Sequence, residues 1–531
     1  MHNTWWVTRP KRDIRGIVPI LAVFASQAEG RKWSYPDKRT ELAIESALEE
    51  AGLKRKGRRR DQQGGGARTY RAWLKSLGLI FMDTEDRMWT TLAGSLILQG
   101  EPPLPIMSKL VLSTQFPSAF SASGPSKVAD RFHVRPFVFL LQLLRHPDLH
   151  GYLDERDEIA KIVIAYGEDN SDECVDSVVD RILEHRRRGD SSLEPDYVER
   201  FKSSRTQASS IEHLTGNFRD IANTLANQLS LTQLVTVQQG GRWEITTGAE
   251  DAVDEAISVY RDLDLIQKPQ DEEFFQRKFG VPPGRTKDNR SLIPGAQSVG
   301  AAAILEKEIT SAFLAMSASR VITALTPEIC DEIARRTGAS VKIVDRVLAR
   351  KFRAGGIDTF MTEYAVLAFG SRENAAAFEE ATASIFSDIF GFKVARVGSK
   401  GIRPDVVISS PVGGYAAILD AKAYGVSYSA THDHRNRMVR YIREYREYAI
   451  DDNPLAFFGY VVSEYKPTID GQLADISREA QIPGSAITAR DIIRMVERHK
   501  THKYTHEEIR RILSKGRGLT SADLMLDPEV D

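Results

Sequence analysis

The sequence predicts a multidomain protein with a helical N-terminal half that contains two winged-helix-like units, followed by an α/β domain with a mixed central sheet. Its 531 residues correspond to three or four domains of ordinary size. A helix followed by a short β-hairpin occurs twice in the N-terminal half, and beyond residue 380 strands alternate with helices, as in α/β sheets. We expect two N-terminal subdomains at residues 1–145 and 146–280, a linker at 281–300 and a C-terminal domain at 301–531.

The composition excludes several classes of protein. Hydrophobic residues make up 42% of the chain and charged residues 27%, which is ordinary for soluble proteins. No apolar run is long enough to cross a membrane; Phe137–Leu144, for example, spans eight residues and includes Gln142. The N-terminus lacks the pattern of a secretory signal, and the two cysteines, Cys174 and Cys330, cannot form a metal site or a disulfide framework by themselves. We therefore expect a cytoplasmic protein with no membrane partner.

The net charge of −1 hides two segments of opposite charge. Residues 1–75 carry 17 Lys and Arg against 8 Asp and Glu, whereas residues 148–184 carry 3 against 12. The densest basic run, Lys54–Arg60, has six positive charges in seven residues. Because such charges repel one another unless anions lie between them, the run indicates contact with the phosphates of DNA, and a solvated loop is the alternative reading.

The basic run precedes the first helix–hairpin unit. Residues 67–77 have apolar side chains at helical spacing and end at Gly78. Residues 79–91 read as a β-hairpin with its turn at 83–86, and another helix begins at Leu92. A helix followed by a short hairpin is how a winged helix-turn-helix ends, and in that motif a helix enters a DNA groove.

The same order of elements recurs about 155 residues later. A helix is expected over 218–229 and a hairpin over 232–246, with its turn at 238–241. Trp89 and Trp243 occupy equivalent positions in the two return strands. We interpret the pattern as an internal repeat, with two unrelated units as the alternative. Only the first copy lies beside the basic run, so the second is expected to pack against the first or to contact less phosphate.

Twelve Lys and Arg residues in and around the first unit are candidates for contact with DNA. Base reading needs Arg, Lys, Asn or Gln side chains at groove depth, and the sequence does not separate such contacts from phosphate contacts. The candidates are Arg9, Lys11, Arg12, Lys54, Arg55, Lys56, Arg58, Arg59, Arg60, Arg68, Arg71 and Lys75.

Residues 281–295 are the best linker candidate, because three prolines and two glycines there block regular structure near the midpoint of the chain. A helical region follows, from about Ala301 to Glu380, before the alternating strands and helices begin.

The chemically informative residues lie at 401–422. Pro411–Gly414 form a turn between two apolar strands, which predicts a β-hairpin. Asp405 and Asp420 are equidistant from the turn, so a symmetric register places them opposite each other, with Cβ atoms roughly 5 Å apart. Lys422 follows Asp420 by two residues and points to the same face of its strand.

Two opposed carboxylates in a hydrophobic sheet repel each other strongly. A divalent cation between them removes the repulsion, and a ligand set of oxygens favours Mg²⁺, with Mn²⁺ as a substitute. A lysine beside such a site can orient or deprotonate a water molecule, while the metal stabilises charge that develops on a phosphate. Asp405, Asp420 and Lys422 therefore predict phosphodiester hydrolysis.

Two further polar segments lie near this hairpin in sequence. The helix expected over 374–390 offers Glu379 and Glu380, either of which would complete the metal shell; we place Glu379 in the candidate catalytic set, with a solvent-facing charge as the alternative. His432-Asp433-His434 is interpreted as a polar loop, because no second ligand group lies at a useful spacing.

The C-terminal segment, from about Glu379 to Arg517, resembles the cleavage domain of FokI-type restriction endonucleases, a PD-(D/E)xK nuclease domain. The matching residues are Asp420-Ala421-Lys422-Ala423-Tyr424, Met438-Val439-Arg440-Tyr441-Ile442 and Phe457-Phe458-Gly459-Tyr460-Val461-Val462-Ser463. The resemblance implies that Asp405 and Asp420 bind Mg²⁺, with the carbonyl of Ala421 as a further ligand, and that Lys422 assists the attacking water.

The N-terminal half resembles the recognition region of the AlwI-like type IIS family, which includes both strand-nicking and double-strand-cutting enzymes. The matching segments are Trp6-Val7 and residues 78–83, 115–118, 136–140 and 273–283. One position departs from the FokI-type pattern: Asn436 stands where that family has an Asp that pairs with Arg across a cleavage-domain dimer, whereas Arg440 is kept. A substitute pair, a heterodimer or cleavage of one strand all stay open.

Together these features predict a type IIS restriction endonuclease that binds a short asymmetric site in double-stranded DNA and cuts a fixed distance downstream with Mg²⁺. The implied partners are DNA, a transient second copy or a second nuclease subunit, and a cognate DNA methyltransferase of the same restriction–modification system. The alternatives are a nicking enzyme or the large subunit of a heterodimer and, in another class, a DNA-binding regulator with an inactive nuclease domain. The intact set of Asp405, Asp420 and Lys422 argues against the regulator.

Overall fold

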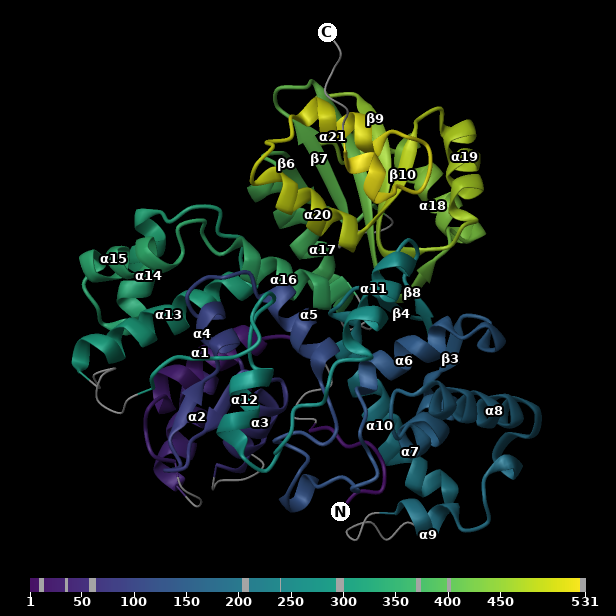
Figure 1. Ribbon diagram of the computed structural model, residues 1–531. Coiled ribbons are helices and arrows are strands. Elements are labelled where there is room, and N and C mark those ends of the chain that lie inside the picture. Colours follow the sequence, from purple (N-terminus) through teal and green to yellow (C-terminus); the bar gives the residue numbers. More distant parts are fainter. Residues whose placement is uncertain are drawn as a thin grey trace.

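Figure 1 shows the computed structural model, in which a C-terminal sheet stands above a larger, mostly helical part. The structure describes residues 1–8, 14–33, 37–56, 64–202, 210–238, 240–292, 300–368, 374–398 and 403–525, without the side chains of residues 424–426. None of the helices in these ranges is both long enough and apolar enough to span a membrane.

The first helix–hairpin unit lies among the helices of residues 17–113. The elements there are α1 (Ile17–Ala28), α2 (Lys38–Glu50), α3 (Gly65–Ser76), β1 (Ile80–Met82), β2 (Met88–Thr90), α4 (Leu92–Ile97) and α5 (Pro103–Ser113). The strands β1 and β2 pair antiparallel with Phe81 opposite Trp89, and the indole N–H of Trp89 donates to Asp83 Oδ2 at 2.8 Å across the turn. The order of α3, hairpin and α4 is the one predicted.

The second unit forms as predicted, within a larger sheet. The elements are α6 (Pro136–Arg145), β3 (Tyr152–Asp154), a π-helical segment (Glu155–Val163) that continues as α7 (Ile164–Tyr166), α8 (Asp172–Arg188), α9 (Tyr197–Phe201), α10 (Ile211–Ser230), β4 (Val235–Gln238), β5 (Arg242–Ile245), α11 (Glu250–Tyr260) and α12 (Glu272–Phe279). Val237 lies opposite Trp243, which is fully buried like its counterpart in the first unit. Here β3 joins the hairpin, and the indole N–H of Trp243 donates to Glu155 Oε2 at 3.2 Å.

The C-terminal part contains the predicted mixed sheet. Its elements are α13 (Ala301–Ser319), α14 (Pro327–Thr337), α15 (Val341–Lys351), α16 (Ile357–Ala368), α17 (Ala375–Ser384), a π-helical segment (Ile385–Ile389), β6 (Lys393–Arg396), β7 (Val406–Ser410), β8 (Tyr415–Tyr428), α18 (His432–Arg443), β9 (Leu455–Tyr465), α19 (Ile469–Ala480), β10 (Gly484–Thr488), α20 (Ala489–His499) and α21 (His506–Leu513). The strand order is β10-β9-β8-β7-β6. The pairs β6–β7 and β7–β8 are antiparallel, and β8–β9 and β9–β10 are parallel.

Both faces of this sheet are covered, as its alternating side chains require. On β7, Val406 and Ile408 pack with α16, α17, α20 and α21, whereas Val407 faces the core shared with α18 and α19. Figure 1 shows α17 and α20 on one side of the strands and α18 and α19 on the other. The hairpin β7–β8 is therefore held between two apolar layers, which fixes the side chains at its open end.

The helices before the sheet are divided between two cores. Buried residues of α13, α14 and α15 pack with α1, α2, α3 and α5, whereas α16 and α17 pack on the sheet. Residues 281–292, the described part of the expected linker, form no helix or strand. They lie on the first unit, where Arg290 pairs with the buried Asp288 at 2.8 Å and donates to the carbonyl of Thr90 at 2.8 Å.

The interpretation of His432-Asp433-His434 as a polar loop is wrong. These residues form the first turn of α18. The helix begins there because the hydroxyl of Thr431 accepts a hydrogen bond from the backbone N–H of His434 at 3.3 Å, the usual role of threonine at a helix N-cap.

Candidate active site

Asp405 and Asp420 lie at the open end of the β7–β8 hairpin. The register runs from Ser410 opposite Tyr415 to Val406 opposite Leu419, so the two aspartates occupy the next position beyond the last paired residues. This is the symmetric register expected from the turn. Gly414 permits the turn because its φ of +63° is a conformation that glycine adopts without strain.

Lys422 completes a compact cluster with these two carboxylates. Its Nζ lies 2.7 Å from Asp420 Oδ2 and 3.3 Å from Asp405 Oδ2. The backbone N–H of Ala421 donates to Asp405 Oδ2 at 2.8 Å and fixes that carboxylate against β8. The three side chains are between 7% and 16% exposed, so two nearly buried carboxylates share the single ammonium group of Lys422. The structure thus brings together the three residues that the sequence singled out at this hairpin.

The electrostatics of the cluster fit an added cation. Burial, reinforced by the negative charge of Asp420, holds the pKa of the Asp405 carboxyl well above its usual range. The Oδ1 atom of Asp420 is buried and accepts no hydrogen bond from the described residues. Among those residues no group of three or more His, Cys, Asp or Glu side chains is placed to hold a metal. The protein therefore offers two carboxylates, and Mg²⁺ is commonly held by one or two carboxylates together with water.

Glu379 and Glu380 differ in their position relative to the cluster. Burial raises the pKa of Glu379; the charge of Asp420 adds to this effect and that of Lys422 opposes it. Glu379 is therefore close enough to the cluster to feel both charges. The side chain of Glu380 is 68% exposed and pairs with Arg396 at 3.5 Å. Of the two glutamates on α17, Glu379 is the half-buried one, and its carboxyl interacts with the charges of the cluster.

The helix α18 and the strand β9 add Tyr441, His434 and Tyr460 around the cluster, none of which the sequence placed in the site. Burial and then the charge of Asp420 raise the pKa of Tyr441 to about 12 and that of Tyr460 well above its usual range. Burial and the nearby Lys422 lower the pKa of His434. The only signal in the sequence was that the two tyrosines fall in segments that match the nuclease family.

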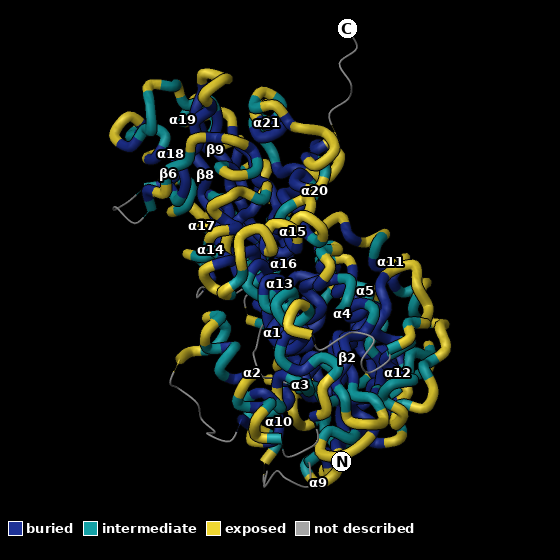
Figure 2. Tube along the Cα trace, turned by 90° about the vertical axis from the view of Figure 1, so that its left-hand side faces the viewer, coloured by how far each residue is buried: buried dark blue, intermediate teal, exposed yellow. Residues whose placement is uncertain are grey.

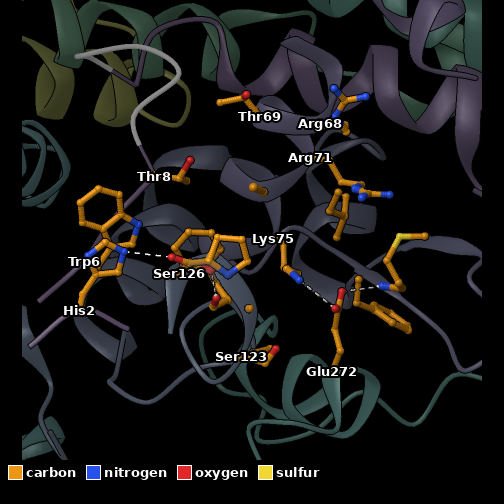
Figure 3. A pocket seen from close by; sticks show the side chains of 18 of the residues that line it. His2, Trp6, Thr8, Arg68, Thr69, Arg71, Lys75, Ser123, Ser126 and Glu272 are labelled. Atoms are coloured by element: carbon orange, nitrogen blue, oxygen red, sulfur yellow. Dashed lines mark hydrogen bonds and ion pairs between the residues drawn. The ribbon is translucent and has the colours of Figure 1, made fainter. Parts of the chain in front are cut away.

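A second candidate site is a cleft of about 1,030 Å³ between the two helix–hairpin units, hereafter the α3–α10 cleft (Figure 3). Its lining includes Arg68, Arg71 and Lys75 of α3, three of the twelve cations proposed for DNA contact. The rest of the lining comes mainly from the N-terminal segment, the first hairpin, residues 119–126 and α10, together with Trp33, Phe201 and Glu272. It includes His2, Trp6, Ser123, Ser126 and Asn217.

Each of the three cations is held by a fixed partner. Arg68 Nη1 lies 2.6 Å from Glu41 Oε2. The guanidinium of Arg71 lies over the ring of Trp33, 4.5 Å from its centroid. Figure 3 shows Lys75 pointing to Glu272, whose Oε2 is 2.9 Å from Nζ.

The other nine candidate cations differ in their surroundings. Lys54 forms an ion pair with the buried Glu45, whereas Arg55 and Lys56 are exposed. The remaining six lie outside the described residues; they are Arg9, Lys11, Arg12, Arg58, Arg59 and Arg60. Sequence reasoning missed Asn217 and Glu272, which stand far from α3 in the chain and carried no motif.

Comparisons with known proteins agree with the geometry of the sheet. Residues 338–520 match the protein family described as "FokI, cleavage domain". The type II restriction enzyme StsI of Streptococcus sanguinis is 25% identical over 145 residues, and the match covers 25% of this chain and 24% of the relative. The matched segment is thus about a quarter of the length of that curated relative.

Solved structures similar to this chain include the restriction endonuclease FokI, alone and bound to DNA. Each is 12% identical with a TM-score of 0.28; the alignments cover 97% of this chain and 100% and 99% of those chains. The BpuJ1 endonuclease binding domain in a complex with pyrene- and phenanthrene-modified DNA is 15% identical, with a TM-score of 0.36, over 52% of this chain and 96% of that chain. The family match covers the hairpin and the whole sheet, so the C-terminal α/β domain is similar to the FokI cleavage domain.

Proposed function

We propose that the protein is a type IIS restriction endonuclease, in which the N-terminal half binds a short asymmetric site in double-stranded DNA and the C-terminal domain hydrolyses the backbone at a fixed distance from it. The observation that carries the proposal is the cluster of Asp405, Asp420 and Lys422 inside a segment that matches the FokI cleavage domain. The likeness to StsI, a type II restriction enzyme, supports the same activity.

Asp405 and Asp420 would hold a Mg²⁺ ion, or Mn²⁺ in its place, and the carbonyl of Ala421 is the further ligand that the family resemblance implies. The unpartnered Oδ1 of Asp420 and the raised pKa of Asp405 support this, because both mark negative charge that the described side chains leave incompletely compensated. When bound, the ion supplies positive charge that stabilises the negative charge developing on the scissile phosphate.

The remaining chemistry belongs to the side chains. A water molecule loses a proton as its oxygen forms a bond to phosphorus, the ester bond to the leaving oxygen breaks, and that oxygen takes up a proton from the solvent, so that protons balance. Lys422 orients the water through its Nζ, which Asp420 and Asp405 hold in place. Glu379 of α17, whose carboxyl interacts electrostatically with Asp420 and Lys422, is the third carboxylate of the proposed catalytic set.

We propose the α3–α10 cleft as the place where the DNA sequence is read, by two winged-helix-like subdomains of AlwI-like type at residues 1–145 and 146–280. The cleft receives Arg68, Arg71 and Lys75 from α3. Arg55 and Lys56, which are exposed, suit contacts with phosphate. We propose residues 281–300 as the linker and 301–531 as the cleavage domain, although α13, α14 and α15 of that range pack on the N-terminal helices rather than on the sheet. A cognate DNA methyltransferase is the expected functional partner.

A nicking enzyme, or the large subunit of a heterodimer, is the second candidate. Arg440 pairs at 2.8 Å with Glu444, the residue that follows α18, and the exposed Asn436 carries no charge with which to pair an arginine of a second copy. Both observations weaken the charge pair that would hold two cleavage domains together, and a single domain cuts one strand.

The test is digestion of supercoiled and genomic DNA with Mg²⁺, followed by sequencing of the new ends. The proposal predicts ends at one fixed offset from one short asymmetric sequence. Linear plasmid would show that both strands are cut, and open circle alone would show nicking. Absence of new ends, or ends scattered without a common sequence, would contradict the proposed function.

A further inference from the structure

We propose that α14 and α15 form a third DNA-contacting module, a helix-turn-helix unit in which α15 lies against the duplex between the recognised site and the cut. The proposal rests on the proposed function and adds a binding surface outside both the α3–α10 cleft and the carboxylate cluster.

The connection between the two helices is that of a helix-turn-helix. The helix α14 ends at Thr337 and α15 begins at Val341, so three residues join them. The first of these, Gly338, has a φ of +69°, a backbone conformation that is costly for any residue with a side chain. A turn of three or four residues that contains glycine is typical of this motif.

The buried faces of the two helices pack against each other and on α13. Ile333 and Ala334 of α14 and Val344 and Val347 of α15 are buried in one cluster with Phe313 of α13. The three helices thus pack on one another and, in the same core, on α1 and α5, and not on the sheet. The opposite face of α15 is left outward.

The outward face of α15 carries cations that the protein itself does not use. Lys342 and Arg346 are exposed, and neither forms a salt bridge with any residue that the structure describes. By contrast, Arg350 and Lys351, one turn later, pair with Glu306 at 2.6 and 3.0 Å. Residues 335–353 contain seven Lys and Arg against one acidic residue, so the unpaired cations are not neutralised from within the module.

Apolar side chains stand beside these cations at the start of α15. Val341 is 42% exposed and Ile343 is 40% exposed, which places them among the few large hydrophobic residues at the surface of the described chain. In the helix-turn-helix motif the N-terminal residues of the second helix contact base edges. Exposed apolar side chains can contact thymine methyl groups, and the neighbouring cations can contact phosphates. A merely solvated basic helix needs no exposed Val and Ile at this end.

The position of the module suits DNA that runs from the recognised site to the cut. In both Figure 1 and Figure 2, α15 lies at a height between α2 and α3 below and the C-terminal sheet above. Figure 2 shows α15 as an exposed stretch on the face turned toward the viewer. The duplex that flanks the site on its cut side is therefore the occupant that we assign to this surface.

The test is binding of the full chain to two duplexes, one that ends just beyond the recognised site and one that continues past the cut. The variant carries Lys342→Glu and Arg346→Glu. The control carries Arg187→Glu and Arg188→Glu on α8, which Figure 1 places far from α15. Both cations are exposed, and Arg188 pairs with Glu184 of its own helix at 2.7 Å. Circular dichroism of each variant verifies the fold.

We expect the wild-type protein and the control to bind the long duplex more tightly than the short one. The double variant of α15 should bind the long duplex about tenfold or more weakly at 0.1 M salt, and the slope of log K against log salt should fall by about 2, roughly 0.9 for each phosphate that the variant no longer neutralises. Its affinity for the short duplex should be unchanged.

An unchanged preference of the α15 variant for the long duplex would overturn the proposal. Loss of cleavage with unchanged DNA binding would also overturn it, because α15 would then contact protein rather than DNA. A wild-type chain that binds neither duplex would instead contradict the proposed function, and the module with it.

Discussion

Glu464 is a buried carboxyl whose ionisation should set the stability of the contact between the two halves of the protein. It lies near the end of β9 and is 2% exposed. It lines a cavity of about 260 Å³ that residues 246–248 of the N-terminal half and residues of β10 and α20 enclose. The N–H of Tyr465 donates to Oε1 at 3.1 Å, whereas Oε2 has no hydrogen-bond partner among the described residues.

The size of the effect follows from the pKa of this group. Burial, with the charge of Asp491 adding to it, raises the pKa of Glu464 from its ordinary 4.5 to about 7, against the opposing effects of the Tyr465 N–H, the Thr247 side chain and the charge of Arg490. Because the folded protein binds this proton more tightly than the unfolded chain does, protonation of Glu464 stabilises the fold. This stabilisation of the folded state is fully present below pH 4.5 and is lost as the pH rises through 7. At about 1.4 kcal/mol per pH unit, the rise from 4.5 to about 7 corresponds to about 3 kcal/mol.

The substitution Glu464→Gln keeps the shape of the protonated side chain and removes the titration. We expect the variant to be more stable than the wild type at pH 8, by up to about 3 kcal/mol, and nearly equal to it at pH 5. Urea unfolding followed by far-ultraviolet circular dichroism measures the difference. All six tryptophans lie in residues 1–243, so their fluorescence reports separately on the N-terminal half.

The matched control is Glu255→Gln, which removes the same charge from an exposed position on α11. It should leave the difference between pH 5 and pH 8 unchanged. Equal unfolding midpoints for the wild type and the Glu464 variant at pH 8, or an equal gain in the control, would refute the reasoning.

Two further substitutions test the first helix–hairpin unit and its cleft. A Cβ at Gly94 would lie 2.4 Å from the carbonyl oxygen of Leu79, so Gly94→Ala should lower the free energy of unfolding by about 1–3 kcal/mol in thermal unfolding. The control is Gly216→Ala on α10, where the added methyl meets nothing within 4 Å, and it should be neutral or slightly stabilising. An equal loss of stability in both variants would contradict the account. Glu272→Gln removes the charge that holds Lys75 at 2.9 Å, so discrimination between the recognised site and an altered site should fall about tenfold in a binding titration. Unchanged discrimination would show that the Lys75–Glu272 pair takes no part in reading the bases.

Local sequence patterns predicted the features of the fold that depend on residues close together in the chain. The positions of Asp405 and Asp420 follow from a tight turn and an antiparallel register, both of which a short segment determines. The repeated Trp89 and Trp243 identified two hairpins because each ring is buried at the same place in its strand. Another local signal, a threonine that caps the start of a helix, was present at Thr431, but it was not used to predict α18.

Contacts between distant segments left no such pattern. Lys75 and Glu272 are paired across 197 positions, and Glu464 meets Thr247 only after the two halves have come together. The side chains at these contacts are ordinary surface types, and their role comes from the closure of the chain. The α14–α15 turn was visible as Gly338 between two amphipathic helices, and it was read only as part of a helical region.

The central claim, that the hairpin cluster cleaves DNA bound elsewhere on the chain, is tested most directly by Asp420→Asn. Asparagine has nearly the same volume, so the substitution removes one metal-binding charge and leaves the sheet packed. The matched control is Asp452→Asn, an exposed position after α18. Cleavage of a labelled duplex and binding of the same duplex are measured side by side, with Mg²⁺ in the first and Ca²⁺ in the second.

We predict that the Asp420 variant loses cleavage by about a hundredfold or more and binds the recognised site as tightly as the wild type, while the control does both normally. Cleavage by the Asp420 variant at the wild-type rate, with the purified protein free of other nucleases, would contradict the account.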